Sequence, residues 1–291
     1  MKFNRTYFIE AQGVDGEWHY FTTPLSLDFT VQQGVLQVTQ VASFRLYNIS
    51  PLHRDVLYRD PIDLTDYREI IFRAGYGRRE TMPIVFSGYI RSCHSYRAVG
   101  TTEYITEIEC IDGIWAKQKA YSSFTESEGS KQNVVERLIS DLSAYNVTAG
   151  AIGEITGDYP RGITCVGNTV KLLQEITDGK MFISDGKVYI LNENEAVNKG
   201  VAVIDSKTGL LGTPRQSGVQ IRLSMIFEPN MRPGQMIDIN SSADMPYLRK
   251  GNGRYKVYGI VHNGTISDAV SGKCTTNINS LLSDNLIEVD E

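Results

Sequence analysis

The sequence predicts a mainly β protein in which two antiparallel β regions flank a small α+β module. Three observations predict this fold class. Polar and apolar residues alternate with period two in residues 1–118, helical periodicity with capping residues appears in 119–204, and alternation returns in 205–291. We expect these three ranges to be separate domains, because 291 residues suffice for two or three of them.

The first β region is predicted from several strand-like runs. SFRLYNI (43–49) and EYITEIEC (103–110) alternate between the two faces of a strand. PIVFSGYIRS (83–92) is a further strand with Gly88 inside it. Glycine inside a strand often marks a bulge or a bend. We therefore expect a strongly curved sheet or an open barrel.

The middle region changes to helical spacing. Ser130 can cap a helix that starts at the next residue, and Asn168 can cap a second helix that Gly179 ends. MFISDGKVYI (181–190) then places an Asp-Gly pair between two apolar runs. This pair is a strong hairpin signal. The region therefore predicts a small α+β module.

The second β region begins near residue 205. GVQIRLSMIF (218–227) alternates most clearly of all the runs in the chain. Pro233 and Gly234 predict a turn, and YKVYGIVHNG (255–264) predicts another strand. This return to strands is compatible with a structural duplication of the first β region. The sequence alone does not prove such a duplication.

Composition excludes several function classes. The net charge is −5, and no basic run offers phosphate contacts, so stable nucleic-acid binding is disfavoured. No stretch approaches the ~20 apolar residues of a membrane helix. That excludes a pore filter as the meaning of Gly-Tyr-Gly at the end of REIIFRAGYG (68–77). The N-terminus lacks the apolar core of a signal peptide, and the four cysteines read as free thiols of a protein made in a reducing cytoplasm.

Motifs for catalysis, metal binding or cofactor binding are absent from the sequence. The four histidines form no metal-ligand spacing, and His262 is expected to be a satisfied core or surface group. Glu107 and Glu109 share one strand face, which suits a solvated surface better than a glycosidase cleft. Asp112 and Gly113 end a strand and predict a turn. We expect no catalytic residues, metal or cofactor, and a non-enzyme is favoured.

Six phrases, in order along the chain, resemble one family, the baseplate hub proteins of contractile phage tails (the late control protein D-like family). These phrases are ASFRLYNISP (42–51), IIFRAGYG (70–77), IVFSGYIRS (84–92), TEYITEIECIDG (102–113), GLLGTPRQSGVQIRLSMIFEPNMRPGQMIDI (209–239) and GRYKVYGIVHNG (253–264). The chain departs from the family at Thr265, where members often have aspartate after His-x-Gly. The chain also looks shorter than many hubs.

The resemblance implies two tube-protein-like antiparallel β-barrel domains. Three chains would form a homotrimeric ring of six such domains, adapting a sixfold tail tube to a threefold central spike around a lumen for DNA. The implied partners are a second copy of the chain, the tail tube protein and the spike, with tape measure and baseplate wedge proteins as further candidates. The implied location is the virion tail baseplate, assembled in the host cytoplasm.

The residue patterns above and the resemblance together give candidate turn and interface residues. They are Gly75, Tyr76, Gly77, Gly88, Asp112, Gly113, Pro233, Gly234 and His262. The two glycines around Tyr76 would permit a sharp turn, because glycine tolerates positive φ. Tyr76 would then pack at the turn or against a neighbouring subunit, and a tyrosine buried within one chain is an equal alternative.

Two other functions remain open from the sequence. The 16 tyrosines and many carboxylates also suit a carbohydrate-binding or glycan-degrading β protein. A distal tail protein of a non-contractile phage would share tube-like domains with a hub.

Overall fold

The computed structural model describes residues 5–63, 65–77, 79–239, 253–268, 272–282 and 286–291. The predicted fold class is confirmed, because most of these residues lie in strands that pair mainly antiparallel, and the helices are few and short. No helix among them is long and apolar enough to cross a membrane. All four cysteines are buried free thiols.

The first β region forms a strongly curved sheet around its own core. Its elements are β1 (Arg5–Gln12), β2 (Trp18–Thr22), β3 (Leu27–Gly34), β4 (Val41–Tyr47), α1 (Pro51–Leu57), β5 (Glu69–Tyr76), η1 (Arg79–Thr81), β6 (Ile84–Arg97) and β7 (Tyr104–Ile111). Alternate side chains are buried along these strands, as the period-two pattern requires. Ser50 caps α1 by accepting a hydrogen bond from the backbone N–H of His53 at 3.2 Å.

Gly88 lies inside β6, opposite Ile70 of β5. The register shifts on either side of it, between Phe72 and Arg73 in β5 and between Ile90 and Ser92 in β6. A Cβ atom at Gly88 would lie 3.0 Å from the Cα atom of Asp112, so glycine is needed for this close approach.

The middle of the chain forms the small module. Its elements are α2 (Ile114–Lys119), β8 (Tyr121–Glu126), β9 (Gly129–Ser130), α3 (Lys131–Leu142), η2 (Ser143–Tyr145), β10 (Thr148–Ile152), β11 (Asp158–Tyr159), β12 (Ile163–Asn168), α4 (Thr169–Ile176), β13 (Met181–Ser184) and β14 (Lys187–Ile190). The two predicted caps are confirmed, because Ser130 and Asn168 accept hydrogen bonds from backbone N–H groups three residues ahead. β13 and β14 form the predicted hairpin.

The second β region supplies the other half of the main sheet. Its elements are β15 (Glu195–Ile204), β16 (Leu210–Ser217), β17 (Gln220–Ile226), β18 (Gln235–Ile239), β19 (Gly253–Ile266), β20 (Cys274–Leu282) and β21 (Ile287–Val289). The start of β19 pairs with β18, and its end pairs with β3 of the first β region. β19 therefore joins the two β regions into one sheet.

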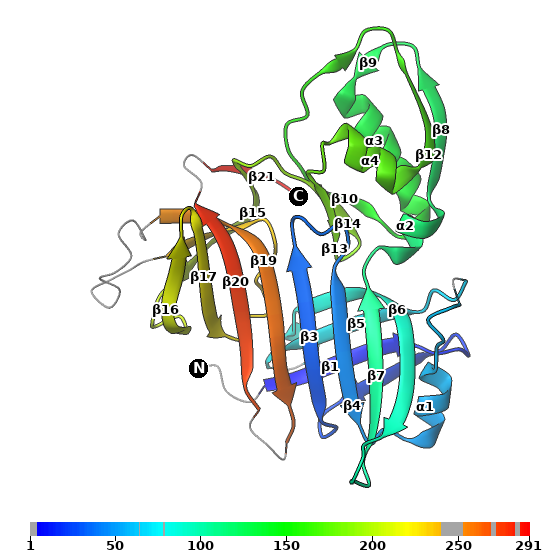
Figure 1. Ribbon diagram of the computed structural model, residues 1–291, viewed down its shortest axis with the longest axis vertical. Helices are drawn as coiled ribbons and strands as arrows, with labels where there is room; N and C mark the ends of the chain where they lie inside the picture. Colours follow the sequence, from blue (N-terminus) through cyan, green and yellow to red (C-terminus); the bar gives the residue numbers. More distant parts are fainter. Residues whose placement is uncertain (1–4, 64, 78, 240–252, 269–271, 283–285) are drawn as a thin grey trace.

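The joined sheet crosses the molecule in the order β16-β17-β20-β19-β3-β4-β7-β6-β5-β1-β2. Figure 1 shows β16 to β7 side by side, with β1 and β5 behind them and the small module at one end. β16 and β2 are the ends of this strand order. At the junction, Gly34 and Gly259 lie opposite each other, and a Cβ atom at Gly34 would lie 3.2 Å from the carbonyl oxygen of Tyr258.

Separate hydrophobic clusters fill the three parts of the chain. The first cluster includes Phe227, Ile266 and Cys274 from the second β region, so the two β regions share part of one core. A fourth, smaller cluster packs Phe182 and Leu191 of the module against Val197 of β15. The small module is therefore packed onto the β regions as well as tethered to them.

Candidate functional site

One face of the joined sheet is polar from β17 to β7. Its outward side chains are paired across neighbouring strands, which places them on the same face. The apolar residues Val41, Val261 and Leu281 lie on the same face. Its polar side chains are Gln220, Arg222, Ser224, Asn277, Asn279, Asn263, Thr265, Asp28, Thr30, Gln32, Ser43, Arg45, Glu107 and Glu109. We call this set the polar face.

Side-chain hydrogen bonds run across the centre of the polar face. The hydroxyl of Ser224 donates to Asn277 at 2.6 Å, and the hydroxyl of Thr275 donates to Asn263 at 2.6 Å. The hydroxyl of Thr265 donates to Asp28 at 2.6 Å. Thr265 is the residue that departs from the family pattern, and here it satisfies a carboxylate of the first β region. These bonds hold amide, hydroxyl and carboxylate groups in place at the centre of the face.

Asp28 of β3 is a carboxylate near the centre of the polar face, and the other charges lie toward its two ends. At the β7 end, Glu107 accepts from Arg45 at 2.9 Å. At the other end, Arg222 of β17 lies directly opposite Arg215 of β16. Both arginines are exposed, and neither has a carboxylate partner among the residues that the structure describes. Like charges directly opposite each other destabilise a strand pair.

Behind the polar face, Tyr76 connects the two β regions. Its hydroxyl donates to the carbonyl oxygen of Phe227 at 3.1 Å, and burial raises its pKa to about 12. The ring of Phe227 also lies edge-on to the ring of His262, with 5.6 Å between centroids. In this structure Tyr76 therefore contacts a strand end of its own chain.

The two glycines beside Tyr76 differ in conformation. Gly77 has φ +152°, which favours glycine, whereas Gly75 lies within β5 opposite Thr6 and shows no positive φ. A Cβ atom at Gly75 would lie 3.7 Å from the ring of Pro229. The turn therefore depends on Gly77, and Gly75 lies at the contact with the second β region.

His262 is fully buried in β19. Its Nδ1 lies 2.9 Å from the hydroxyl of Thr276. Burial, with a smaller effect from the charge of Arg232, lowers the pKa of His262 to about 3. The imidazole is therefore neutral at physiological pH, and it is enclosed rather than available to a ligand.

The remaining sequence candidates meet at the small module. Gly113 has φ +63°, and a Cβ atom there would lie 3.1 Å from the side chain of Ile183 in β13. Gly234 has φ +80°, and its Cβ atom would lie 2.8 Å from Leu191. Pro233 precedes Gly234 in a turn closed by the Gln235 N–H and the Arg232 carbonyl at 3.3 Å. The turns at Gly113 and Gly234, which are distant in sequence, therefore both lie against the β13–β14 hairpin and the residue after it.

Sequence reasoning missed the polar partners at this junction. Asp112 reads as a turn residue in the sequence, but the structure buries it beside the β13–β14 turn. Asp185 of that turn and Arg232 form an ion pair at 3.4 Å. The Asp-Gly pair at 185–186 predicted the hairpin, but nothing in the sequence indicated that its aspartate faces two other parts of the chain.

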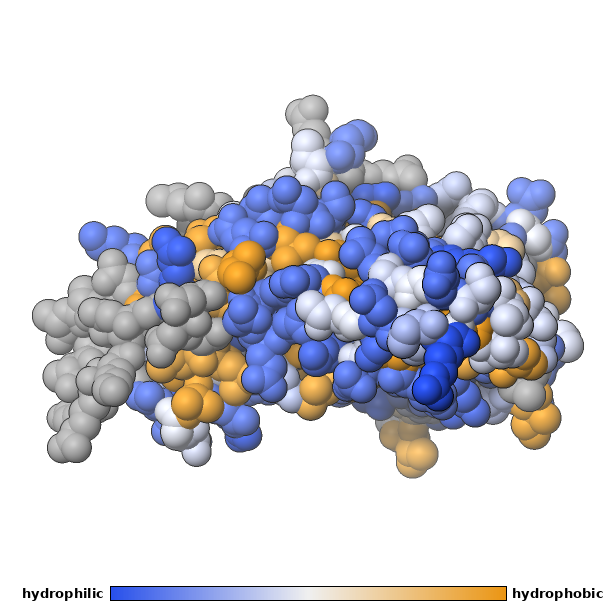
Figure 2. Space-filling model, turned by 90° about the horizontal axis from the view of Figure 1, so that it is seen from above, coloured by the Kyte–Doolittle hydropathy of each residue, from blue (hydrophilic) through white to orange (hydrophobic). Residues whose placement is uncertain are grey.

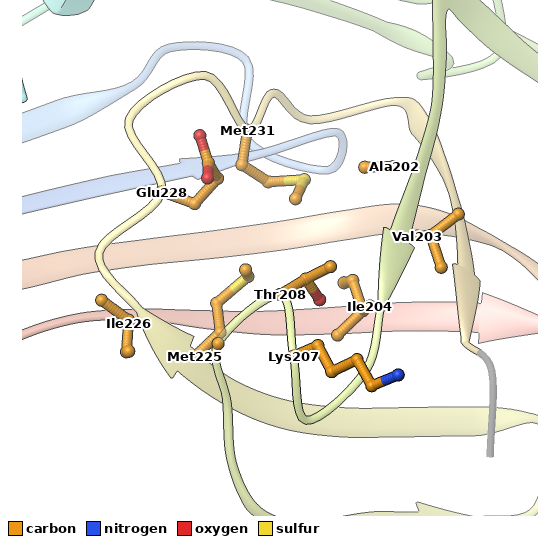
Figure 3. Close-up of a pocket in the computed structure, with 10 residues that line it drawn as sticks. Ala202, Val203, Ile204, Lys207, Thr208, Met225, Ile226, Glu228 and Met231 are labelled. Carbon is orange, nitrogen blue, oxygen red and sulfur yellow. The ribbon is translucent and has the colours of Figure 1, made fainter. Parts of the chain in front are cut away.

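A pocket lies in the second β region, between β15, the end of β17 and the loop after it (Figure 3). Its walls are mainly apolar, with Ile204, Met225 and Met231 among them. Lys207 and Glu228 lie on different sides of it in Figure 3. Within the described ranges, no three His, Cys, Asp or Glu side chains group as metal ligands would. The described part of the pocket therefore holds no such group of metal-ligating side chains.

Figure 2 shows the molecule from the end that carries the small module. This surface is mostly hydrophilic, and its hydrophobic residues appear as separate groups. Large exposed apolar side chains among the described residues include Leu52, Ile62 and Val99. Single exposed apolar residues are normal on proteins and do not identify a partner.

Comparison with solved structures places this fold among phage tail proteins. A 43 kDa tail protein of prophage MuSo2 from Shewanella oneidensis superposes with a TM-score of 0.61 at 6% identity, covering 96% of this chain and 98% of that one. The tail protein of Neisseria meningitidis MC58 gives 0.59 at 9% identity, covering 96% and 97%. At these identities the likeness concerns the fold.

A third solved structure is an E. coli component of the type VI secretion system, described as structurally similar to T4 bacteriophage tail proteins. Its TM-score is 0.56 at 9% identity, covering 91% of this chain and 76% of that one. The chain belongs to the family described as baseplate hub gp41, whose family model matches residues 14–263. Among curated proteins, none matches this chain. The family is a structural component of phage tails.

Proposed function

We propose that this protein is the structural hub of a contractile tail baseplate, a homotrimeric ring that adapts the sixfold tail tube to the threefold spike. The observation that carries the proposal is the continuous polar face across both β regions. Pairing of β3 with β19 joins the two β regions into one continuous sheet. Its centre presents amides and hydroxyls with few charges, which suits a surface that DNA passes without binding.

The proposed ring uses the chain as two similar building blocks. We assign 1–118 and 205–291 to the two tube-like domains and 119–204 to the small module. The separate hydrophobic clusters support this division except at its two bounds. Ala116 of α2 packs in the cluster of the module, and Ile204 of β15 packs in the third cluster. Repeating two such blocks three times gives six positions, which matches a sixfold tube while keeping threefold symmetry for a spike.

The ends of the strand order support assembly with a second copy. β16 lies at one end, where its Arg215 faces Arg222 of β17, and β2 lies at the other end. An edge strand offers unpaired backbone groups to a neighbouring chain. In this proposal the polar face lines the lumen, and tube protein and spike bind opposite rims of the ring. The role is structural, without catalysis, in a virion tail that is assembled in the host cytoplasm.

The test is the native mass of the purified protein, with electron microscopy of the same sample alone and mixed with the tube and spike proteins of its own tail. We expect a particle of three chains with an open centre, and binding of each partner to a different rim. An Asn263→Trp variant should narrow the lumen visibly in averaged images, because Asn263 is on the polar face. An Asp158→Trp variant on the small module is the matched control.

A particle that stays a monomer with both partners present contradicts the hub proposal. So does a ring whose polar face points outward. Specific binding to glycans, together with failure to bind tube or spike, would favour the carbohydrate-binding alternative instead. Binding to a non-contractile tail tube, without a spike, would favour the distal tail protein.

A further inference from the structure

The short strand β21 covers one edge of β15. It runs parallel to β15, with Ile287 opposite Glu195 and Val289 opposite Val197. The backbone N–H of Ile287 also donates to the carbonyl oxygen of Asn194 at 2.9 Å. Val197 pairs with β18 as well, so β18 occupies the other edge of β15. Figure 1 shows β21 beside β15, on the side of the small module.

Side-chain contacts continue this register beyond β21. The amide of Asn198 donates to the carboxylate of Asp290 at 2.7 Å. Nζ of Lys199 lies 2.8 Å from Oε1 of Glu291. Both contacts keep the offset of the strand pair, so residues 287–291 follow residues 195–199 of β15 one by one. We call residues 287–291 the strap.

The strap has one side toward the small module. Side chains alternate between the two faces of a strand, so Glu291 points to the same side as Val289. Val289 packs against the fourth hydrophobic cluster, which contains Phe182 and Tyr189 of the module. Asp290, between them, is exposed. The strap therefore lays one valine and one carboxylate on the module.

The Glu291 carboxylate lies in a cradle of three donors. Lys199 of β15 is the first, and the other two come from β14 of the module. Nζ of Lys187 lies 3.2 Å from Oε2, and the hydroxyl of Tyr189 donates to Oε1 at 2.7 Å. The Tyr189 ring is 7% exposed and stacks on Phe182 with 5.0 Å between centroids, which fixes its hydroxyl. One carboxylate thus bridges the module and β15.

The cradle favours the charged carboxylate. Burial alone would raise the pKa of Glu291, but hydrogen bonds from the two lysines and Tyr189 outweigh it and lower the pKa to about 2. Burial, with the charge of Glu291, raises the pKa of Tyr189, so its hydroxyl keeps the proton that it donates. The nearby carboxylate of Asp185 has its own cation, Arg232, at 3.4 Å. Without the charge of Glu291, the two lysines would face each other with no anion between them.

We propose that the strap is releasable, that it closes the open edge of β15, and that the Glu291 carboxylate fastens it to the small module. The strap pairs with β15 through only three residues, and Val289 is only partly buried, so the carboxylate supplies a large share of the attachment. Short segments of this kind open locally while the rest of a protein stays folded. Opening exposes the backbone groups of residues 195–197, so the closed strap protects an edge to which other chains could pair.

Hydrogen exchange followed by mass spectrometry, on the full chain, tests the attachment. The comparison is between wild type and Glu291→Gln, which keeps the side-chain shape and removes the charge that the lysines bind. The opening constant of residues 194–199 and 286–291 should rise about tenfold, because hydrogen bonds to charged groups contribute at least that factor. Strands β3 and β4 of the first β region should exchange as in wild type.

Glu288→Gln is the matched control. Glu288 lies on the same strand and is exposed, and alternation points it away from the cradle. Its exchange should stay within about twofold of wild type. A variant with both Lys187→Gln and Lys199→Gln removes the cations of the cradle. On that background Glu291→Gln should raise the opening constant by a much smaller factor, since only the bond from Tyr189 remains to be lost.

Equal exchange of residues 286–291 in wild type and Glu291→Gln overturns the proposal. An increase that β3 and β4 share does the same, because the opening would then be unfolding of the whole chain. An effect of Glu291→Gln that is as large without the two lysines would show that the cradle does not hold the strap. None of these results bears on the hub function, which native mass and partner binding measure separately.

Discussion

The hydroxyl of Tyr76 donates a hydrogen bond to the carbonyl oxygen of Phe227, 151 residues later in the chain. Tyr76 ends β5 of the first β region, and Phe227 follows β17 of the second. The Phe227 ring also packs against Phe29, with 5.6 Å between centroids. This contact ties the back of the joined sheet together, so Tyr76 serves the fold of one chain in the structure described.

Replacing Tyr76 by phenylalanine tests that role. The change keeps the ring and removes the donor to Phe227, so the free energy of unfolding should fall by about 1 kcal/mol. Urea unfolding at constant pH measures the loss. Tyr121→Phe is the matched control, because that side chain is 62% exposed, and it should stay within ~0.5 kcal/mol of wild type. Equal effects of the two changes would contradict the role assigned to Tyr76.

The Gly234→Ala substitution tests the packing of the second β region against the module. A Cβ atom there would lie 2.8 Å from Leu191 on a backbone with φ +80°. Gly218 has φ +61° with open space around it, so Gly218→Ala isolates the backbone cost, ~1–2 kcal/mol. Gly234→Ala should lose a further ~1–3 kcal/mol from overpacking. Thermal or urea unfolding of both variants measures the difference, and equal losses would exclude the predicted contact.

His262 predicts sensitivity to acid. Its pKa of about 3 in the folded protein lies below that of an unfolded histidine, so the unfolded chain binds the proton first. The resulting stabilisation is present above about pH 6.5 and is lost as the pH falls toward about 3. Between pH 6.5 and 4.5 the loss should reach ~2–3 kcal/mol relative to a variant without the imidazole.

The measurement compares urea unfolding of wild type and His262→Gln at the two pH values. Glutamine retains a group that can bond Thr276 and does not titrate in this range. His94→Gln is the control, because the His94 side chain is 54% exposed. A difference between wild type and His262→Gln that is the same at both pH values would show that the imidazole is not buried as described.

Arg222→Gln separates the stability of one chain from assembly. Removing one of two arginines that lie opposite each other should stabilise the isolated chain by ~0.2–1 kcal/mol. If the β16 end of the sheet meets a carboxylate of a second copy in the proposed trimer, the same change should weaken that assembly. Urea unfolding and native mass at graded protein concentrations give the two results. Lys171→Gln, an exposed residue of α4, should change neither. A trimer as strong as wild type would exclude this edge from the interface.

Local features were predictable because they depend on neighbours in sequence. Ser130 and Asn168 cap the two helices as expected, since a cap requires only a side-chain oxygen and a backbone N–H three residues ahead. The Asp-Gly pair at 185–186 forms the predicted hairpin for the same reason. Alternation in β17 predicted which of its side chains point outward. Those side chains form part of the polar face.

The sequence by itself thus determined the fold class, the order β, α/β, β and the outward side of individual strands. Only the tertiary structure decided that β19 pairs with β3, that Tyr76 reaches Phe227, and that Asp112 is buried beside Asp185. Alternation gives the face of each strand but not its neighbour, because pairing is set by chain segments more than 200 residues apart. The ionisation of a carboxyl group depends in the same way on the solvent and charges around it, which only the folded chain defines.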